Sequence, residues 1–179
     1  SLLNALECLL AANIEYDVAD ESQIGRLVSN PPRLLIVPLA YALADETIEH
    51  LKKLAEGGCQ IYLSGDPGID SFGRRNPQRL QALCGVDYLD TTNHPSGLPV
   101  SQVKALSAEA VKNPVGIPLY RDNLGQGKVL YTPEPWETFS GTDLFVERPE
   151  LTSDIKTNLY LSLLPLTGIQ LPVTIDSST

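Results

Sequence analysis

The chain has 179 residues, of which 42% are hydrophobic and 20% are charged, a composition typical of a soluble globular protein with a real core. Its formal net charge is -9 and its lysines and arginines are scattered, so it lacks the basic patch of a nucleic-acid-binding protein. Neither an apolar run of membrane-spanning length nor a signal-like start occurs in the sequence, which argues against a membrane protein.

Methionine is absent, even at position 1, so we expect the chain to be a piece of a longer protein. We expect that protein to be soluble, with the cytoplasm favoured over other compartments. The three cysteines, Cys8, Cys59 and Cys84, show no metal-ligand spacing and are predicted to be small buried hydrophobic residues. No cofactor and no metal site is predicted.

Leucines recur with helical spacing at the start of the chain and predict a helix over residues 2–12. Alternating apolar side chains then predict a short strand over residues 14–18. Residues 33–37 are almost entirely apolar, which is typical of a strand buried on both faces. A helix over residues 43–58, with acidic residues in its first turn and a glycine stop, leads to a second buried strand over residues 59–65. The strand, helix and strand form a parallel crossover unit.

The second half of the chain begins with a polar loop over residues 66–75 and a short helix that ends at Gly85. Residues 87–114 are rich in Pro, Ser and Asn and predict an irregular surface excursion. Two strands joined by the sequence NLGQG as a hairpin follow, and a closing helix begins near residue 152. We therefore predict one α/β domain over residues 1–179. Its fold would be a three-layer α/β/α sandwich, flavodoxin-like or class I glutamine amidotransferase-like, with a mostly parallel sheet.

The sequence YLSGDPG ends the second buried strand at a polar corner, the place where α/β proteins usually bind substrates. A nucleophilic Ser64 would need a Gly-x-Ser-x-Gly turn that runs directly into a helix. Tyr62 and Asp66 occupy the two glycine positions and Pro67 follows, so the sequence argues against a nucleophile. A phosphate-binding loop is also disfavoured, because Asp66 and Asp70 would repel the anion.

Two pairs of carboxylates are candidates for acid–base chemistry or for a hard-cation site: Asp66 with Asp70, and Glu134 with Glu137. Their spacing matches no calcium-binding loop, so a role in turns and solvated loops is favoured. The two histidines are far apart in the sequence and predict no catalytic or metal-binding pair.

Arginines and a tryptophan give a second group of candidates. Arg74, Arg75 and Arg79 lie ahead of and inside a helix start, where they could hold carboxylates or a partner surface, or simply balance nearby aspartates. The only tryptophan, Trp136, lies on an extended loop between prolines, where it could stack on a sugar, anchor an interface or cap the core. We expect Trp136 near the surface. The candidates for a ligand site or an interface are therefore Trp136, Arg74, Arg75 and Asp66.

The run LLIVPLAYALADETIEHLKKLAEGGCQIYLSGDPGIDSFGRRNPQRLQALCGV contains an apolar strand ending in Pro38 and a helix closed by Gly57 and Gly58. A strand into a glycine-containing loop and a short helix ending in LCGV follow. These features resemble the amidotransferase-like trimerisation domain of glycoside hydrolases related to the family 42 β-galactosidases. The sequence GQGKVLYTPEP is similar to a glycine-lysine strand near the end of such a domain. The resemblance covers residues 1–90 and, more loosely, residues 125–168.

The resemblance implies a class I glutamine amidotransferase fold that has lost its catalytic cysteine. It also implies packing against a catalytic (β/α)8 barrel and contacts in a homo-oligomer, with the catalytic glutamates in the barrel, so it carries over no catalytic residue. We therefore expect a non-catalytic accessory or oligomerisation domain of a carbohydrate-active enzyme. A sugar-binding module that uses Trp136 and an independent small amidotransferase-like hydrolase are the alternatives.

In the predicted fold a strand precedes the first helix and lies between the strands at 14–18 and 33–37, but this chain opens on the helix. A sheet cannot leave such a gap, because unpaired buried backbone groups cost about 1–3 kcal/mol each. We expect the tail over residues 169–176, or the hairpin, to close the sheet, in which case deletion of residues 169–179 lowers the melting temperature. A strand from a neighbouring chain is the alternative.

Overall fold

The structure is a computed structural model that describes residues 2–12, 14–113, 116–138 and 153–168. Helices and strands alternate along most of this length. In chain order they are α1 (Leu2–Ala11), η1 (Glu21–Gln23), α2 (Ile24–Leu27), β1 (Leu34–Val37), α3 (Asp45–Glu56), β2 (Gln60–Ser64), α4 (Pro77–Cys84), β3 (Val86–Asn93), β4 (Pro99–Ala105), β5 (Glu109–Ala110), β6 (Tyr120–Leu124), β7 (Gly127–Thr132), η2 (Trp136–Thr138) and α5 (Ser153–Thr167).

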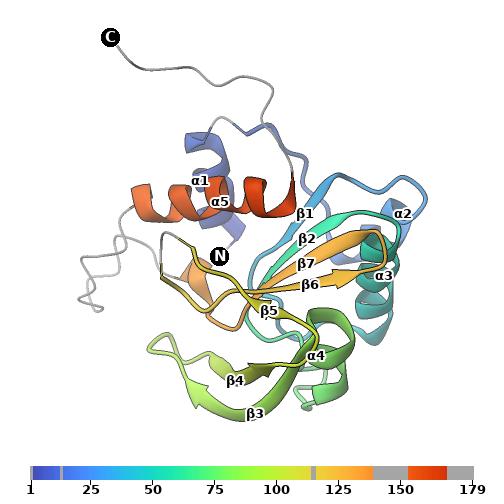
Figure 1. Cartoon of the computed structure of the whole chain (residues 1–179), viewed down its shortest axis with the longest axis vertical. Helices are drawn as coiled ribbons and strands as arrows, with labels where there is room; N and C mark the ends of the chain where they lie inside the picture. Colours follow the sequence, from blue (N-terminus) through green and yellow to red (C-terminus); the bar gives the residue numbers. More distant parts are fainter. Residues whose placement is uncertain (1, 13, 114–115, 139–152, 169–179) are drawn as a thin grey trace.

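A five-stranded sheet with the order β1-β2-β7-β6-β5 forms the middle layer of the fold. β1, β2 and β7 pair in parallel, whereas β6 pairs antiparallel with both β7 and β5, so four of the five strands run in the same direction. Figure 1 shows α1 and α5 over one face of this sheet and α2, α3 and α4 over the other. The prediction of a three-layer α/β fold with a mostly parallel sheet is confirmed.

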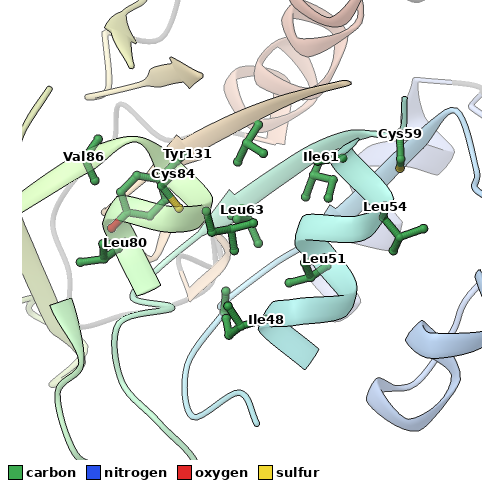
Figure 2. Packing of buried hydrophobic residues seen from close by; sticks show 14 of the residues in the cluster. Ile48, Leu51, Leu54, Cys59, Ile61, Leu63, Leu80, Cys84, Val86 and Tyr131 are labelled. Carbon is green, nitrogen blue, oxygen red and sulfur yellow. The ribbon is translucent and has the colours of Figure 1, made fainter. Parts of the chain in front are cut away.

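Each face of the central sheet has its own buried cluster of apolar side chains. Because side chains alternate along a strand, Ile61 and Leu63 of β2 face α3 and α4, while Tyr62 between them faces α1 and α5. Figure 2 shows the first cluster, in which Ile48 and Leu51 of α3 pack toward β2 and α4. All three cysteines are buried, as predicted.

The β1–α3–β2 crossover forms where the sequence predicts it. Asp45 and Glu46 lie at the positive end of the α3 dipole, and Gly57 caps its other end. Gly58 then adopts φ +105, a conformation that side chains with a Cβ rarely accept, and the Cys59 N–H donates to the carbonyl of a residue in the last turn. This left-handed stop turns the chain directly into β2.

The strand predicted over residues 14–18 is wrong. The Ile14 N–H donates to the Leu9 carbonyl at 2.9 Å, and residues 14–18 form no strand. Ile14 and Tyr16 alternate because both side chains pack against the cluster under α1. β1 lies at the edge of the described sheet, and each described strand is bonded to its neighbour, so the expected gap does not separate any of them. The tail over residues 169–176, which we expected to close the sheet, lies outside the described residues.

The irregular excursion predicted over residues 87–114 is also wrong, because most of it is a β3–β4 hairpin followed by β5. Pro95 and Ser96 lie in the turn of this hairpin, where the His94 N–H donates to the Leu98 carbonyl at 2.9 Å. Val103 of β4 packs against the core cluster, and Val100 of the same strand is buried. The later hairpin, β6–β7, is confirmed.

The closing helix is confirmed as α5, which contains Pro165 within its last turn. Its side chains Leu159, Tyr160 and Leu163 are buried beside α1. Within the described ranges, no helix is long and apolar enough to cross a membrane.

Candidate functional site

The carboxyl ends of β1, β2 and β7 meet at one edge of the central sheet, where the sequence places the polar corner. Ser64 and Thr132, the last residues of β2 and β7, are paired in register and fully buried. Gly65 follows with φ +94, and its N–H donates to the Thr132 carbonyl at 3.0 Å. A Cβ on Gly65 would lie 2.6 Å from the ring of Tyr41, so glycine is what lets Tyr41 cover this corner.

The segment between β1 and α3 holds Tyr41 in place through strained backbone. Leu39 and Ala42 have φ values of +54 and +57, a region that costs non-glycine residues about 1–3 kcal/mol. The Tyr41 hydroxyl donates to the Pro99 carbonyl of β4 at 2.8 Å. Burial, and then the charge of Asp66, raises the pKa of Tyr41 well above its ordinary value. The phenol therefore stays neutral and fixes the β3–β4 hairpin over the corner.

Ser64 is a buried structural hydroxyl and not an exposed nucleophile. Its Oγ accepts a hydrogen bond from the Leu39 N–H at 2.9 Å and donates to Oε2 of Glu137. The chain after Ser64 runs into a long loop instead of a helix, so no nucleophile elbow forms. The sequence argument against a nucleophilic Ser64 agrees with this geometry.

Glu137 of η2 forms a buried polar cluster with Ser64 and Tyr160. Its side chain is 3% exposed, and the Tyr160 hydroxyl of α5 donates to its Oε1 at 2.8 Å. Burial raises the pKa of Glu137 above 4.5, its ordinary value, although the two hydroxyl donors oppose that shift. The ring of Tyr62 packs edge-on against Tyr160, with 5.9 Å between the ring centroids. The sequence analysis did not select either tyrosine. The available signal was the position of Tyr62 between Ile61 and Leu63, which places its side chain on the other face of the sheet.

Asp66 is the centre of a second buried cluster. Its fully buried carboxylate accepts hydrogen bonds from Nη2 of Arg75 at 2.7 Å, from Oγ of Ser101 at 2.7 Å and from the Gly68 N–H at 3.0 Å. The guanidinium of Arg75 also lies 4.5 Å from the ring centre of Tyr88. Ser101 is on β4 and Tyr88 is on β3, so this cluster fastens the hairpin to the end of β2.

The paired aspartates that the sequence allows are not assembled into a joint site. Asp70 forms an ion pair with Arg74 at 2.9 Å, whereas Asp66 binds Arg75, so each carboxylate has its own arginine. The carboxylate of Glu137 likewise accepts hydrogen bonds from the hydroxyls of Ser64 and Tyr160. Among the described residues, no group of three or more His, Cys, Asp or Glu side chains could hold a metal ion.

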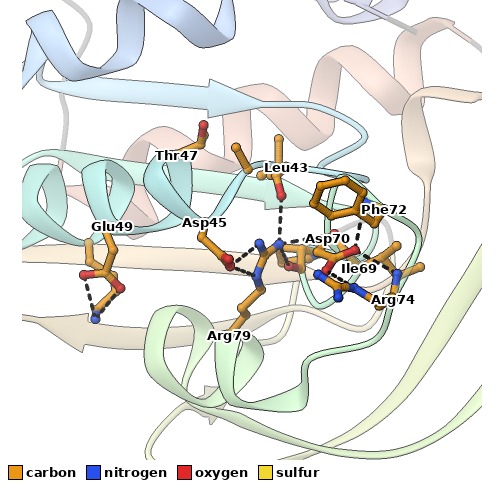
Figure 3. A network of polar contacts seen from close by, with 12 residues as sticks. Leu43, Asp45, Thr47, Glu49, Ile69, Asp70, Phe72, Arg74 and Arg79 are labelled. Carbon is orange, nitrogen blue, oxygen red and sulfur yellow. Dashed lines mark hydrogen bonds and ion pairs between the residues drawn. The ribbon is translucent and has the colours of Figure 1, made fainter.

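Arg79, the third arginine of the loop, is 5% exposed and joins three segments. Figure 3 shows its guanidinium between Asp45 at the start of α3 and the Leu43 and Ile69 carbonyls, which it reaches at 2.9 and 3.3 Å. The interpretation that the arginines balance nearby aspartates is confirmed for Arg74 and Arg75, which pair with Asp70 and Asp66. Arg79 pairs with Asp45 at the start of α3 instead.

The expectation that Trp136 lies near the surface is wrong, because its side chain is 5% exposed. η2, which follows Pro133 and Pro135, packs against α1. The indole Nε1 is buried and has no hydrogen-bond partner within the described part of the chain. A sugar cannot stack on this ring without opening the structure, so the sugar-binding alternative loses the residue on which it depended.

The carboxyl edge of the sheet is thus filled by side chains of the chain itself. The Glu137 cluster ties α5 to the end of β2, and the Asp66 cluster ties the β3–β4 hairpin to the same place. Such an arrangement fixes elements relative to one another. Of the predicted candidates, Asp66, Arg75 and Trp136 are buried or largely covered within it, and Arg74 is the one with an exposed side chain, at 73%.

No protein-family model matches this sequence, and a search of curated proteins finds no match. Solved structures do share its fold. A β-galactosidase from Bacillus circulans sp. alkalophilus aligns with 97% of this chain at a TM-score of 0.67 and 15% identity. A GH42 β-galactosidase from G. stearothermophilus aligns with 98% of it at a TM-score of 0.66 and 17% identity.

The chain spans only 28% and 27% of the lengths of these two enzymes. A protein from Salmonella typhimurium LT2, described as cytoplasmic, aligns with 92% of this chain and 86% of its own length, at a TM-score of 0.64 and 13% identity. Identities this low establish the fold alone. The α/β fold is therefore one that occurs as a segment of family 42 β-galactosidases and also in a protein of similar size.

Proposed function

We propose that this chain is a non-catalytic accessory domain of a glycoside hydrolase, amidotransferase-like in fold, that acts in the assembly of the enzyme. The observation that carries the proposal is the coverage: nearly the whole chain aligns with little more than a quarter of each β-galactosidase. This coverage supports the proposal that the chain is one segment of a longer enzyme. Its partners would be the catalytic barrel of the parent chain, further copies of itself, or both.

The chemistry of the cysteines supports a non-catalytic role. A class I amidotransferase attacks its substrate with a cysteine thiolate, and a thiolate needs a low pKa and access to substrate. Burial raises the pKa of Cys59 to about 11 and raises that of Cys84 well above its ordinary value. Both thiols therefore stay protonated at neutral pH, and the corner after β2 carries Ser64 bound to Glu137 instead.

A stand-alone protein of the same fold is the second candidate, and the Salmonella protein favours it, because this chain covers 86% of that protein's length. That protein is described as cytoplasmic, which supports a cytoplasmic location for this chain. Under this candidate the chain works without a barrel, and its partners are other proteins or further copies.

The coding frame around this segment, and the protein it encodes, test the proposal. We expect a (β/α)8 barrel with paired glutamates beside this domain. Deletion of the domain from that longer enzyme removes none of the glutamates of the barrel. It should abolish subunit assembly, measured by light scattering after gel filtration. A frame that holds this domain alone would favour the second candidate. A longer enzyme that assembles equally well without the domain would contradict the accessory role.

A further inference from the structure

We propose that Glu137, with Ser64 and Tyr160, forms a proton-dependent latch on one flank of the carboxyl edge. With its proton bound, the Glu137 carboxyl holds η2 and α5 against the end of β2. Loss of that proton to solvent releases these two elements while the rest of the domain stays folded. The inference goes beyond the proposed accessory role, because it concerns an internal contact and does not depend on what the domain assembles with.

The latch joins three elements at one carboxyl group. Glu137 of η2 is buried, and its Oε2 accepts a hydrogen bond from the Ser64 hydroxyl at the end of β2. Its Oε1 accepts a hydrogen bond from the Tyr160 hydroxyl of α5 at 2.8 Å. Ser64 Oγ in turn accepts from the Leu39 N–H at 2.9 Å. A change in the charge of this one side chain therefore acts on every contact that fixes η2 and α5 to the end of the sheet.

Burial is what makes the proton of Glu137 matter. Burial raises the pKa of Glu137 above its ordinary value of 4.5, against the opposing effects of the Ser64 and Tyr160 hydroxyls and of the amino terminus of the chain. When η2 and α5 separate from the sheet, water reaches the carboxyl and its pKa returns to the ordinary value. Between these two pKa values the open form binds fewer protons, so its population rises about tenfold for each pH unit and then levels off.

The other titratable groups around the latch keep their charge state in this range or lie beside it without bonding Glu137. They come from the elements packed around the carboxyl: Tyr62 of β2, Tyr160 of α5, Tyr41 of the segment between β1 and α3, Cys8 of α1 and Glu134 ahead of η2. Burial is the main cause that raises the pKa of each of the three tyrosines, so their phenols stay protonated while Glu137 titrates.

Two buried polar groups on this flank gain hydrogen bonds when it opens. The Tyr62 hydroxyl and Nε1 of Trp136 are buried and have no hydrogen-bond partner within the part of the chain that the structure describes. A buried donor without a partner costs free energy that water restores. The closed state of the flank is therefore held less firmly than the burial of its rings alone indicates.

The opposite flank of the carboxyl edge does not share this dependence on the Glu137 proton. There the Asp66 carboxylate binds the guanidinium of Arg75 at 2.7 Å, and arginine keeps its charge over the whole range. Among the described residues, the apolar cluster under α1 and α5 has eight buried members, against sixteen in the cluster under α3 and α4. Regions with fewer buried apolar contacts open at lower free energy. The η2 and α5 flank therefore opens first.

Hydrogen exchange of the 179-residue chain, measured by mass spectrometry from pH 4.5 to 8, tests the latch. The wild type and Glu137→Gln are compared at each pH, because the intrinsic pH dependence of exchange is common to both. The amides to follow are those of Trp136 and Thr138, which bond the Glu134 and Pro135 carbonyls, and those of residues 159–164 of α5. We expect the ratio of wild-type to variant exchange rates to rise by up to about tenfold for each pH unit and then to level off.

Tyr160→Phe distinguishes a latch from a side chain that merely packs. The variant loses one of the hydroxyls that favour the ionised carboxyl, so the pKa of Glu137 in the closed form should rise further. The pH at which exchange levels off should therefore move upward. Glu15→Gln, at an exposed position, is the control and should follow the wild-type profile.

A ratio that stays constant from pH 4.5 to 8 would overturn the latch. A rise shared equally by the amides of residues 100–105 in β4 would overturn it too, because the whole domain would then respond and not one flank. A levelling-off pH that Tyr160→Phe leaves in place would also count against it, since the hydroxyl would then not set the proton affinity of Glu137. If Glu137→Gln does not fold, the comparison of Tyr160→Phe with the wild type decides the matter alone.

Discussion

Replacement of Arg75 by alanine should lower the free energy of unfolding by about 3–5 kcal/mol, because it leaves the Asp66 charge buried without its cation. The Asp66 carboxylate is fully buried, and its remaining donors would be the Ser101 hydroxyl and the Gly68 N–H. The variant also loses the contact of the guanidinium with Tyr88. Urea denaturation followed by circular dichroism measures the difference.

Arg74→Ala is the matched control for this experiment. Arg74 is the adjacent residue and also pairs with an aspartate, but its side chain is 73% exposed. Water replaces an exposed ion pair at little cost, so we expect a loss of less than about 1 kcal/mol. Equal losses in the Arg74→Ala and Arg75→Ala variants would show that the Asp66 cluster does not fasten the hairpin.

Wild-type stability should fall as pH rises from about 4.5 to the pKa of folded Glu137, and Glu137→Gln should remove that fall. The unfolded chain releases this proton near 4.5, the ordinary value, whereas burial lets the folded chain keep it to higher pH. Between these two pKa values the folded state binds more protons, so stability is full below the window and declines across it. The decline is about 1.4 kcal/mol for each pH unit of the window.

Other carboxyl groups with shifted pKa values act in a different range. Hydrogen bonds lower the pKa values of Asp20, Asp70 and Asp87 below 3.8, so their contribution is lost only as pH falls below that value. In urea denaturation between pH 4.5 and 8, the difference between the wild type and Glu137→Gln therefore isolates Glu137, because all other titratable groups are common to both proteins. Glu15→Gln, at an exposed position, is the control and should follow the wild-type curve. A Glu137→Gln variant that also follows that curve would refute a raised pKa.

Local patterns in the sequence were enough to predict the β1–α3–β2 unit, α4 and the β6–β7 hairpin. A long apolar run, a helical stripe and a glycine stop each specify a conformation within a few residues. The alternation at Ile14 and Tyr16 failed, because a local pattern does not reveal whether a neighbouring strand supplies hydrogen bonds. The β3–β4 hairpin was hidden by turn residues that dominated the composition of its segment.

The clusters at the carboxyl edge were harder to predict, because their partners are far apart in the sequence. Ser64 is 73 residues from Glu137, and Asp66 is 35 residues from Ser101. Sequence reasoning could select Asp66 and Arg75 from one polar loop, but only the fold brings β4 and α5 to that loop. Trp136 was misplaced for the same reason, since its burial depends on how η2 packs against α1.

Turnover by the purified chain is the most direct test of whether its filled carboxyl edge is non-catalytic. Steady-state assays would use chromogenic glycosides, chromogenic esters and glutamine, with the wild type and Ser64→Ala prepared in parallel. We expect no hydrolysis above the buffer rate for either protein. Hydrolysis by the wild type that disappears in Ser64→Ala would contradict the assignment and make Ser64 a nucleophile.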